Sequence, residues 1–459
     1  MIQKTIKNNN ITPIVPENEW KVNYPEVDRE YVWTYPMIHG PERFEPKSIF
    51  EESLTPIVSN DLVVYIHLPA CLFRCPMCPF YVEVVKSRQQ IMGYANLVIK
   101  ELELYARTNL LSNYQLKAIY FGGGTASLLF PEDIGKIVKQ IKRYIRHDDD
   151  IDITLEGHPS LVDYNYLSAL YNEGVNRVSF GIQSFNDQDL KAMGLRQTAK
   201  QNYQTLENAI NIGFRTVSAD LLYRLPHQTV EGVRKQLHDF LDTGISSLSA
   251  YSLELSVRQG EQRKYQASEE EDKEMFYLIN KELLKNGWNH TAQPDYSKKE
   301  NISKETIVTW KAPQGQTLGL GAGACSALNN TTYFNVHSME EYKNVVNEGC
   351  LPILAGQRYT LADAMSRYMV LGARCFELPR KPFSDAFGID LADVFASEIK
   401  KLSDLNLVRL DYDKLMVTEK GKYYVDNISK TFYSLENRCH LQPWGEKMKG
   451  AVASDYLYI

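Results

Sequence analysis

Three cysteines, Cys71, Cys75 and Cys78, lie within eight residues in the spacing C-x3-C-x2-C. A structural zinc site normally takes four ligands, often as two separated pairs. No second pair follows here, and the nearest other candidate, His67, lies before the cysteines in an apparent strand. Three thiolates on one loop suit a [4Fe–4S] cluster with one iron that lacks a protein ligand. That iron could bind a small molecule through nitrogen and oxygen, so we favour a cluster over zinc or a redox disulfide.

Strands and helices alternate after the cysteine loop begins. Six short apolar runs with strand character, most of them separated by helical patterns, span residues 62–68, 117–122, 151–157, 177–182, 216–222 and 247–255. This alternation predicts an α/β fold of parallel strands joined by right-handed crossovers. Six strands are too few for a complete barrel, so we expect a partial (β/α)6 TIM-type barrel whose site lies at the carboxyl ends of its strands.

The chain divides into five expected parts. They are an N-terminal arm over 1–58, the partial barrel over 59–290, a Gly-rich connecting segment over 291–355, an α+β winged-helix-like domain over 356–430, and a tail over 431–459. The arm is polar and rich in proline, which indicates a covering segment. The winged-helix-like domain has no strong basic excess, so it favours packing or interaction over DNA binding.

Composition narrows the classes of protein. Lys plus Arg is 51 and Asp plus Glu is 57, which gives 51 − 57 = −6 and argues against a nucleic-acid partner. No apolar run is long enough to span a membrane, and the first residues lack the apolar core of a signal peptide. We expect a soluble cytoplasmic protein with no membrane partner. Four further cysteines are scattered singly and are expected to be buried: Cys325, Cys350, Cys375 and Cys439.

The first strand and the cysteine loop read VVYIHLPACLFRCPMCPFY. This resembles the radical SAM superfamily, in its oxygen-independent coproporphyrinogen III oxidase-like branch, which typically carries Y-[IV]-H-[IL]-P-F-C-x3-C-x2-C. Tyr65, His67 and Pro69 match that pattern together with the three cysteines. Ala70 stands where the family has a bulky aromatic residue, and a further cysteine found in the porphyrinogen oxidase is absent. The second departure weakens the case for the oxidase activity itself.

Further motifs follow in the family's order: FGGGT (121–125), ITLEGHP (153–159), NRVSFGIQSFND (176–187), MGLRQTAK (193–200) and DLLYRLPHQT (220–229). The resemblance implies a [4Fe–4S] cluster on the three cysteines and S-adenosylmethionine (SAM), in one molecule or two. It implies SAM contacts at Tyr65, Gly123, Gly124, Thr125, Glu156, Gln183, Arg196 and Asp220, and it assigns no residue that acts on the substrate. Arg224 replaces a usual glycine, which suggests an anionic or altered substrate.

The resemblance also implies a reaction. SAM would be cleaved reductively to a 5′-deoxyadenosyl radical that abstracts hydrogen from a small-molecule substrate, with an electron from flavodoxin or ferredoxin. Among the reactions of this family we favour methyl or methylene transfer with two SAM molecules, on a small-molecule or natural-product substrate. Oxidative decarboxylation of coproporphyrinogen III, or other porphyrin or haem chemistry, is the alternative.

A haem-binding chaperone is the non-enzyme alternative. The hallmark of that chaperone is an H-N-x-x-Y-W segment before the Gly-rich stretch. The equivalent segment here, SKETIVTW (303–310), keeps only Trp310, which disfavours haem carriage.

Overall fold

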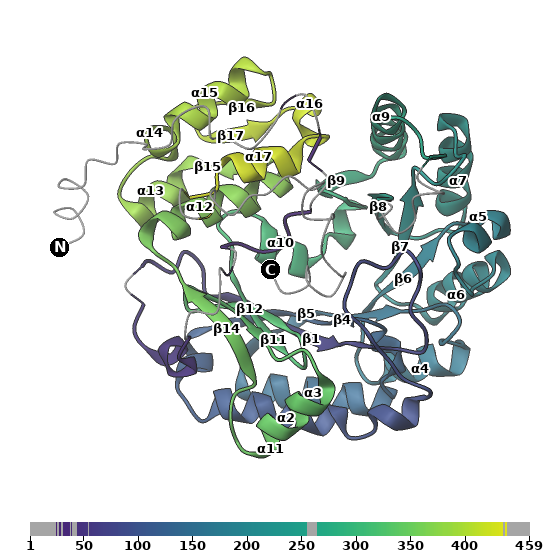
Figure 1. The fold of residues 1–459 in the computed structure, drawn as a ribbon, viewed down its shortest axis with the longest axis horizontal. Coiled ribbons are helices and arrows are strands. Elements are labelled where there is room, and N and C mark those ends of the chain that lie inside the picture. Colours follow the sequence, from purple (N-terminus) through teal and green to yellow (C-terminus); the bar gives the residue numbers. More distant parts are fainter. Residues whose placement is uncertain are drawn as a thin grey trace.

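The computed structural model of the chain describes residues 24, 27, 28, 31–36, 38, 44–53, 55–254, 264–434 and 437. In this part of the chain the largest sheet has twelve strands in the order β14-β13-β12-β11-β1-β4-β5-β6-β7-β8-β10-β9 (Figure 1). None of the described helices is both long and apolar enough to cross a membrane.

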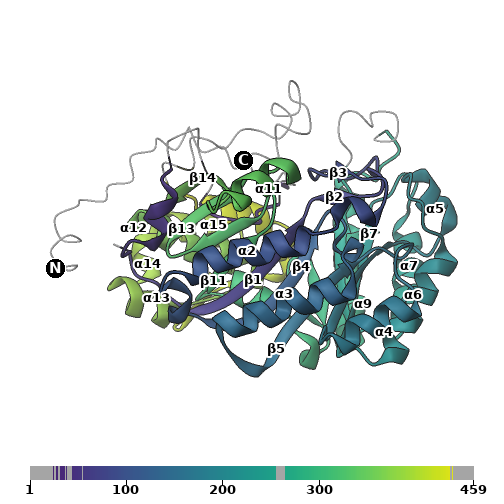
Figure 2. The ribbon, with the colours of Figure 1, turned by 90° about the horizontal axis from the view of Figure 1, so that it is seen from below.

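Six consecutive parallel strands form the centre of the sheet. They are β1 (Asp61–Leu68), β4 (Gln115–Gly123), β5 (Arg146–Gly157), β6 (Arg177–Gln183), β7 (Thr216–Tyr223) and β8 (Ser247–Ser252). The helices that follow them cover the outer face, as Figure 2 shows for α2 (Tyr94–Ala106) and α3 (Pro131–Tyr144). Apolar side chains of strands and helices share one continuous core. The expected partial barrel is therefore confirmed.

The remaining outer helices follow in chain order. They are α4 (Tyr164–Asn172), α5 (Asp187–Ala192), α6 (Ala199–Ile212), α7 (Val230–Asp242) and α9 (Glu269–Lys285).

Residues 291–355 do more than connect two domains. On one side, β11 (Gln316–Leu320) pairs in parallel with β1, and β12 (Cys325–Leu328), β13 (Thr331–Asn335) and β14 (Ile353–Arg358) continue the sheet in antiparallel fashion. On the other side, β10 (Asp295–Ser297) pairs with β8 and with β9 (Asn289–Ala292). Consequently β1, the strand that leads into the cysteine loop, lies between two hydrogen-bonded neighbours.

The C-terminal unit has its own core and a small sheet of order β15-β17-β16. Its strands are β15 (Glu377–Pro379), β16 (Val408–Leu410) and β17 (Lys414–Val417), and its longer helices are α12 (Leu361–Gly372), α13 (Arg380–Phe387), α15 (Ala396–Asp404) and α17 (Val425–Thr431). This arrangement of helices and short strands is the expected α+β winged-helix-like domain.

The part of the N-terminal arm around residues 31–36 lies against this C-terminal unit. The backbone N–H of Val32 donates to Asp426 (2.9 Å), and Arg367 donates to the carbonyl of Tyr35 (2.6 Å). Val32 and Tyr35 are buried in the core of the unit, whereas Tyr31 and Trp33 stay 38% and 42% exposed. The arm thus covers a core with some side chains and presents others to open space. Residues 438–459 of the expected tail lie outside the described residues.

A buried carboxyl group ties the Gly-rich segment to α2. Glu101 on α2 is fully buried and accepts hydrogen bonds from Tyr342 Oη (2.6 Å), Asn335 Nδ2 (2.7 Å) and the N–H of Gly321 (2.8 Å). Burial raises the pKa of Glu101 to about 7, although the three donors oppose that shift. The network therefore joins elements that are far apart in the chain. It does so through a buried carboxyl group whose pKa is raised.

Replacing Glu101 with Gln is expected to change how stability depends on pH. In the folded protein the pKa of Glu101 lies at about 7 rather than 4.5, so the folded chain holds a proton that the unfolded chain releases. The stability that this proton gives to the folded state is fully present below about pH 4.5 and is lost as the pH rises to about 7. Urea unfolding should show that the free energy of unfolding of the wild type is lower at pH 8 than at pH 5, by up to about 3 kcal/mol. The difference between the two pH values should be smaller in Glu101→Gln. An equal decline in Glu101→Gln would contradict the assignment, and Glu132→Gln, at an exposed site, is the matched control.

Candidate active site

The cysteine loop follows β1 directly. Cys71 lies on β2 (Ala70–Cys71), which pairs in parallel with β3 (Glu83–Val84), and the N–H of Cys78 donates to the carbonyl of Cys75 (3.1 Å). All three thiols are free and half-buried. Burial raises their pKa values, that of Cys75 to about 11, and for Cys71 and Cys75 the neighbouring thiols add to the effect. Three thiolates this close together need a metal centre to stabilise them.

The arrangement of donors suits a cluster better than a single ion. Among the described residues, no group of three or more His, Cys, Asp or Glu side chains is arranged to hold one metal ion. A cluster takes each thiolate at a different iron, so its ligands need not meet at one point. Thr125 Oγ1 donates to Cys71 Sγ (3.2 Å), a second contact of the kind that orients a metal ligand. The three thiols therefore fit a [4Fe–4S] cluster.

The glycines at the end of β4 let that strand approach the cysteine loop. A Cβ on Gly124 would lie 2.8 Å from the carbonyl oxygen of Ala70 and 3.0 Å from Cys71 Sγ. Gly123 has φ +110°, a conformation that residues with a side chain rarely adopt. Its N–H donates a hydrogen bond to the carboxylate of Glu156. Gly123 and Gly124, expected as SAM contacts, thus have a structural reason to be glycine beside any contact with a ligand.

Tyrosines and a carboxylate occupy the inner face of the first strands. Tyr120 Oη donates to Glu156 Oε1 (2.7 Å), and the Tyr120 ring stacks on Tyr65 at 5.9 Å between centroids. Tyr65 Oη also lies 3.3 Å from His67 Nδ1. Burial raises the pKa of Glu156, while the hydrogen bonds from Tyr120 and Gly123 lower it. Tyr65 and Glu156 are therefore brought together beside Gly122, where a Cβ would lie 2.8 Å from Tyr65 Oη and 2.9 Å from Glu156 Oε2.

Gln183 ends β6, and Asp220 lies within the following strand, β7. Asp220 on β7 is surrounded by protein, and burial, then the charges of Glu156 and Asp295, raise its pKa well above the usual value. Gln183, the last residue of β6, has φ +66°, and its carbonyl accepts from Gln236 Nε2 (2.9 Å). Asp220 thus shares the inner face with Glu156, and Gln183 lies at the carboxyl end of the strand between them.

Arg196 lies over the cysteine loop. Its guanidinium is 4.3 Å from the ring centroid of Phe73, and its charge lowers the pKa of Cys75 against the larger effect of burial. The ring of His158 also packs on Phe73, with 5.8 Å between the ring centroids. Burial lowers the pKa of His158 to about 4. The expected SAM contact at Arg196 is therefore next to the cysteines, although its motif is displaced in the sequence.

Two carboxylates on the inner face were not anticipated. Asp295 on β10 accepts from Ser249 Oγ (2.7 Å), and Glu305 on α10 (Lys304–Trp310) has a pKa raised to about 7 by burial and by Asp295 and Glu156. Tyr251 on β8 is 39% exposed and faces the charges of Asp220, Asp295 and Glu156. The only sequence signal was the position of Glu305 in the segment SKETIVTW.

Arg224 does not supply a free cation to the inner face. It pairs with Glu254 and donates from Nε to the carbonyl of Ala267 (3.2 Å). Its φ of +60° explains why glycine is usual at this position. The expectation of an anionic substrate from Arg224 therefore loses its basis, because the positive charge is compensated.

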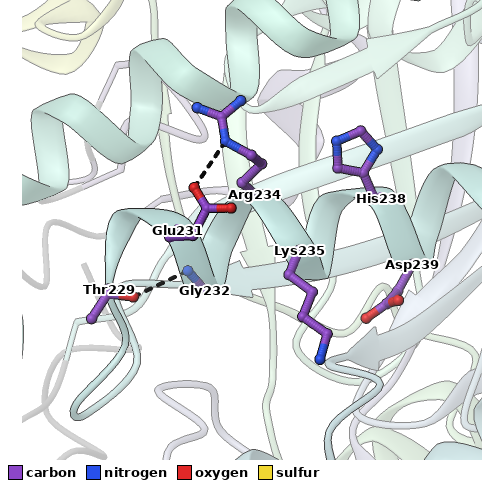
Figure 3. A pocket seen from close by; sticks show the side chains of 7 residues that line it. All are labelled: Thr229, Glu231, Gly232, Arg234, Lys235, His238 and Asp239. Carbon is purple, nitrogen blue, oxygen red and sulfur yellow. Dashed lines mark hydrogen bonds and ion pairs between the residues drawn. The ribbon is translucent and has the colours of Figure 1, made fainter.

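A surface pocket lies elsewhere, on the outer face at α7 (Figure 3). Its walls are charged and polar side chains of one helix, with Thr229 Oγ1 accepting from the N–H of Gly232 (3.1 Å) and Arg234 bonded to Glu231 (3.1 Å). None of the cysteines or expected SAM contacts lines it. We attach no function to this pocket.

Comparison with known proteins agrees with this geometry. Residues 65–240 match the Radical SAM superfamily, and residues 359–424 match the HemN C-terminal domain. The chain is therefore a radical SAM protein, a class that takes a [4Fe–4S] cluster and SAM. More particularly, it joins a radical SAM domain to a HemN C-terminal domain, as the coproporphyrinogen oxidase-like branch does.

The curated relatives include a chaperone, oxidases and an anaerobilin synthase. The heme chaperone HemW of Bacillus subtilis is 27% identical over 377 residues, covering 80% of this chain and 98% of the relative. The oxygen-independent coproporphyrinogen III oxidase of Escherichia coli is 26% identical over 403 residues, covering 83% and 88%. The solved structure of the coproporphyrinogen III oxidase HemN from Escherichia coli matches with a TM-score of 0.73 and 23% identity, covering 85% of this chain and 94% of that one, which shows a shared fold.

Proposed function

We propose that this chain is an enzyme that cleaves SAM reductively and abstracts hydrogen from a small-molecule substrate. The bound cluster and SAM supply a 5′-deoxyadenosyl radical as the abstracting species. The observation that carries the proposal is the joint position of the three thiols, Thr125 and Arg196 at one end of the barrel. Glu156 and Asp220 lie on the inner face that this end opens to.

Each of these side chains has a role that its surroundings favour. Cys71, Cys75 and Cys78 would hold the cluster. Glu156, with one oxygen held by Tyr120, would accept from the ammonium group of SAM, and Asp220 would accept from a ribose hydroxyl. Arg196, whose charge lowers the pKa of Cys75, would pair with the methionine carboxylate. Tyr251, partly exposed on the same face, would exclude water around the substrate.

The test is reductive cleavage in the absence of oxygen. Protein with a reconstituted cluster is mixed with SAM and dithionite, and 5′-deoxyadenosine and methionine are quantified. We expect both products in equal amounts. A full four-iron cluster with no 5′-deoxyadenosine would overturn the enzyme proposal and point to a carrier.

The charges of the inner face support a substrate with few carboxylates. Glu156, Asp220, Asp295 and Glu305 face one another there. The nearby cations are neutralised, Arg177 by Asp152 (3.4 Å) and Arg374 by Asp426 (2.6 Å). A compound with four carboxylates would meet acidic side chains and cations that are already paired, which costs binding free energy. We therefore propose a substrate that is less acidic than coproporphyrinogen III.

The products formed will identify the reaction that follows hydrogen abstraction. The comparisons give no support to the methyl or methylene transfer that the sequence favoured, and the names of the relatives favour porphyrin or haem chemistry. With substrate present, we therefore look first for oxidation without S-adenosylhomocysteine. Formation of S-adenosylhomocysteine and an alkylated product would instead establish transfer from a second SAM molecule.

A haem chaperone is the second candidate, favoured by the similarity to HemW. Its case is weakened by Glu305, an acidic side chain in the segment where the chaperone has its H-N-x-x-Y-W hallmark. Haem added to the anaerobic protein should give no saturable shift of the Soret band. A one-to-one shift would favour the chaperone.

A further inference from the structure

We propose that residues 79–92, together with Arg74, form the docking surface for an acidic one-electron carrier protein. We call this set of residues the carrier surface. The inference rests on the proposed function, because reductive cleavage of SAM needs an electron that the chain does not itself supply. It goes further by locating where that electron enters and by stating the charge of the partner.

Large apolar side chains are unusually exposed on this surface. Phe80 is 61% exposed, Val84 60% and Met92 70%, and all three follow Cys78 within fourteen residues. Burying such side chains in the core would be favourable, so their exposure indicates contact with another molecule. Aromatic residues and methionine are also enriched where proteins meet.

The carrier surface is joined directly to the cluster ligands. Val84 is the register partner of Cys71, and the N–H of Val85 donates to the carbonyl of Cys71 (2.8 Å). Phe80 lies two residues beyond Cys78. Figure 2 shows β2 and β3 side by side at the edge of the barrel, above the ends of β1 and β4. A protein seated on β3 would thus lie one strand away from a cysteine ligand, and electron transfer requires such short distances.

The charge of this surface differs from that of the whole chain. Arg74 and Lys86 are exposed, and neither pairs with a carboxylate among the described residues. The one acidic residue of the segment, Glu83, is turned inward and accepts from the N–H of Met339 (2.7 Å) and from Tyr81 Oη (3.4 Å). On a chain of net charge −6, the exposed cations Arg74 and Lys86 of the carrier surface favour an acidic partner.

The experiment compares two reductants on the same protein. Dithionite, a small molecule, needs no docking surface, whereas reduced flavodoxin, a small acidic protein, does. Formation of 5′-deoxyadenosine is measured with each reductant for wild type, Val84→Glu and Lys86→Glu. We expect the flavodoxin concentration at half-maximal rate to rise at least about tenfold in both variants, while the dithionite rate stays within twofold. Tyr412→Glu, at a site that is 96% exposed in the C-terminal unit, is the matched control and should behave as wild type.

Ionic strength provides a second measurement on the same variants. Added salt should weaken flavodoxin-driven cleavage by wild type more than by Lys86→Glu, because salt screens exposed charges. Unchanged dependence on flavodoxin in both variants would overturn the inference. Equal loss with both reductants would also overturn it, since the substitutions would then act on the cluster. Absence of cleavage with dithionite in wild type would instead refute the proposed function.

Discussion

Cys75→Ala is expected to reduce 5′-deoxyadenosine formation to the background and to lower the iron content of the reconstituted protein. In the proposed site the cluster would have three protein ligands, and Cys75 lies between the other two in the sequence, so its loss would leave two thiols to hold four irons. The variant should remain folded, because the Cys75 side chain is partly exposed and its carbonyl bond to Cys78 is a backbone contact. Iron analysis, the visible absorption of the cluster and product quantification check the prediction.

The matched control is Cys350→Ala. Cys350 was expected to be buried but is an exposed free cysteine outside the loop, so this variant should keep wild-type iron content and cleavage. A Cys75→Ala protein that holds four irons and still cleaves SAM would show that another residue is the third ligand.

Glu156→Ala is expected to weaken SAM binding about ten- to a hundredfold, which corresponds to losing a hydrogen bond to a charged group worth about 1.5–3 kcal/mol. The reason is geometric, since Tyr120 holds one carboxylate oxygen of Glu156 on the inner face. Glu156→Gln should be affected less, because it keeps an acceptor for Tyr120 and loses only the charge. Anaerobic equilibrium dialysis of SAM on cluster-loaded protein gives the dissociation constants.

Glu305→Gln is the control for this prediction. Glu305 faces the same interior, but it is not among the proposed SAM contacts, so its variant should bind SAM within about twofold of wild type. Iron content must be equal in all three proteins for the comparison to hold. A Glu156→Ala protein with unchanged affinity would remove Glu156 from the proposed site.

The central strands could be predicted from the sequence because their apolar runs are continuous and regularly spaced. Parallel strands covered by helices are buried on both faces and so leave a strong signal. The strands that extend the sheet over residues 316–358 have only a weak signal in the sequence. Strands β11, β12 and β13 have four or five residues. Gly321 and Gly323 lie in the turn between β11 and β12, whereas Gly319 permits a close contact: a Cβ there would lie 2.3 Å from the carbonyl oxygen of Cys325.

The part of the site that lies on one short segment of the chain could be predicted from the sequence. The three cysteines share a loop, and Thr125 follows the next strand, so adjacency in the sheet brings them together. Asp295 reaches the inner face because β10 pairs with β8. Glu305 reaches it because α10 packs against β1, β4 and β5, and no local pattern encodes either arrangement. Arg224 shows the same limit, since its charge is visible in the sequence and its partner Glu254 is not.

The position of β1 between β4 and β11 has a consequence for how this chain can be divided. A fragment that ends after α9 would lose β11 to β14 and leave the strand that leads into the cysteine loop as a bare edge. Unpaired edges of this kind recruit strands from other chains. The radical SAM part is therefore not an independent module: its boundaries in sequence and its boundaries in space differ, and insertions or fusions are tolerated only where they leave residues 316–358 in place.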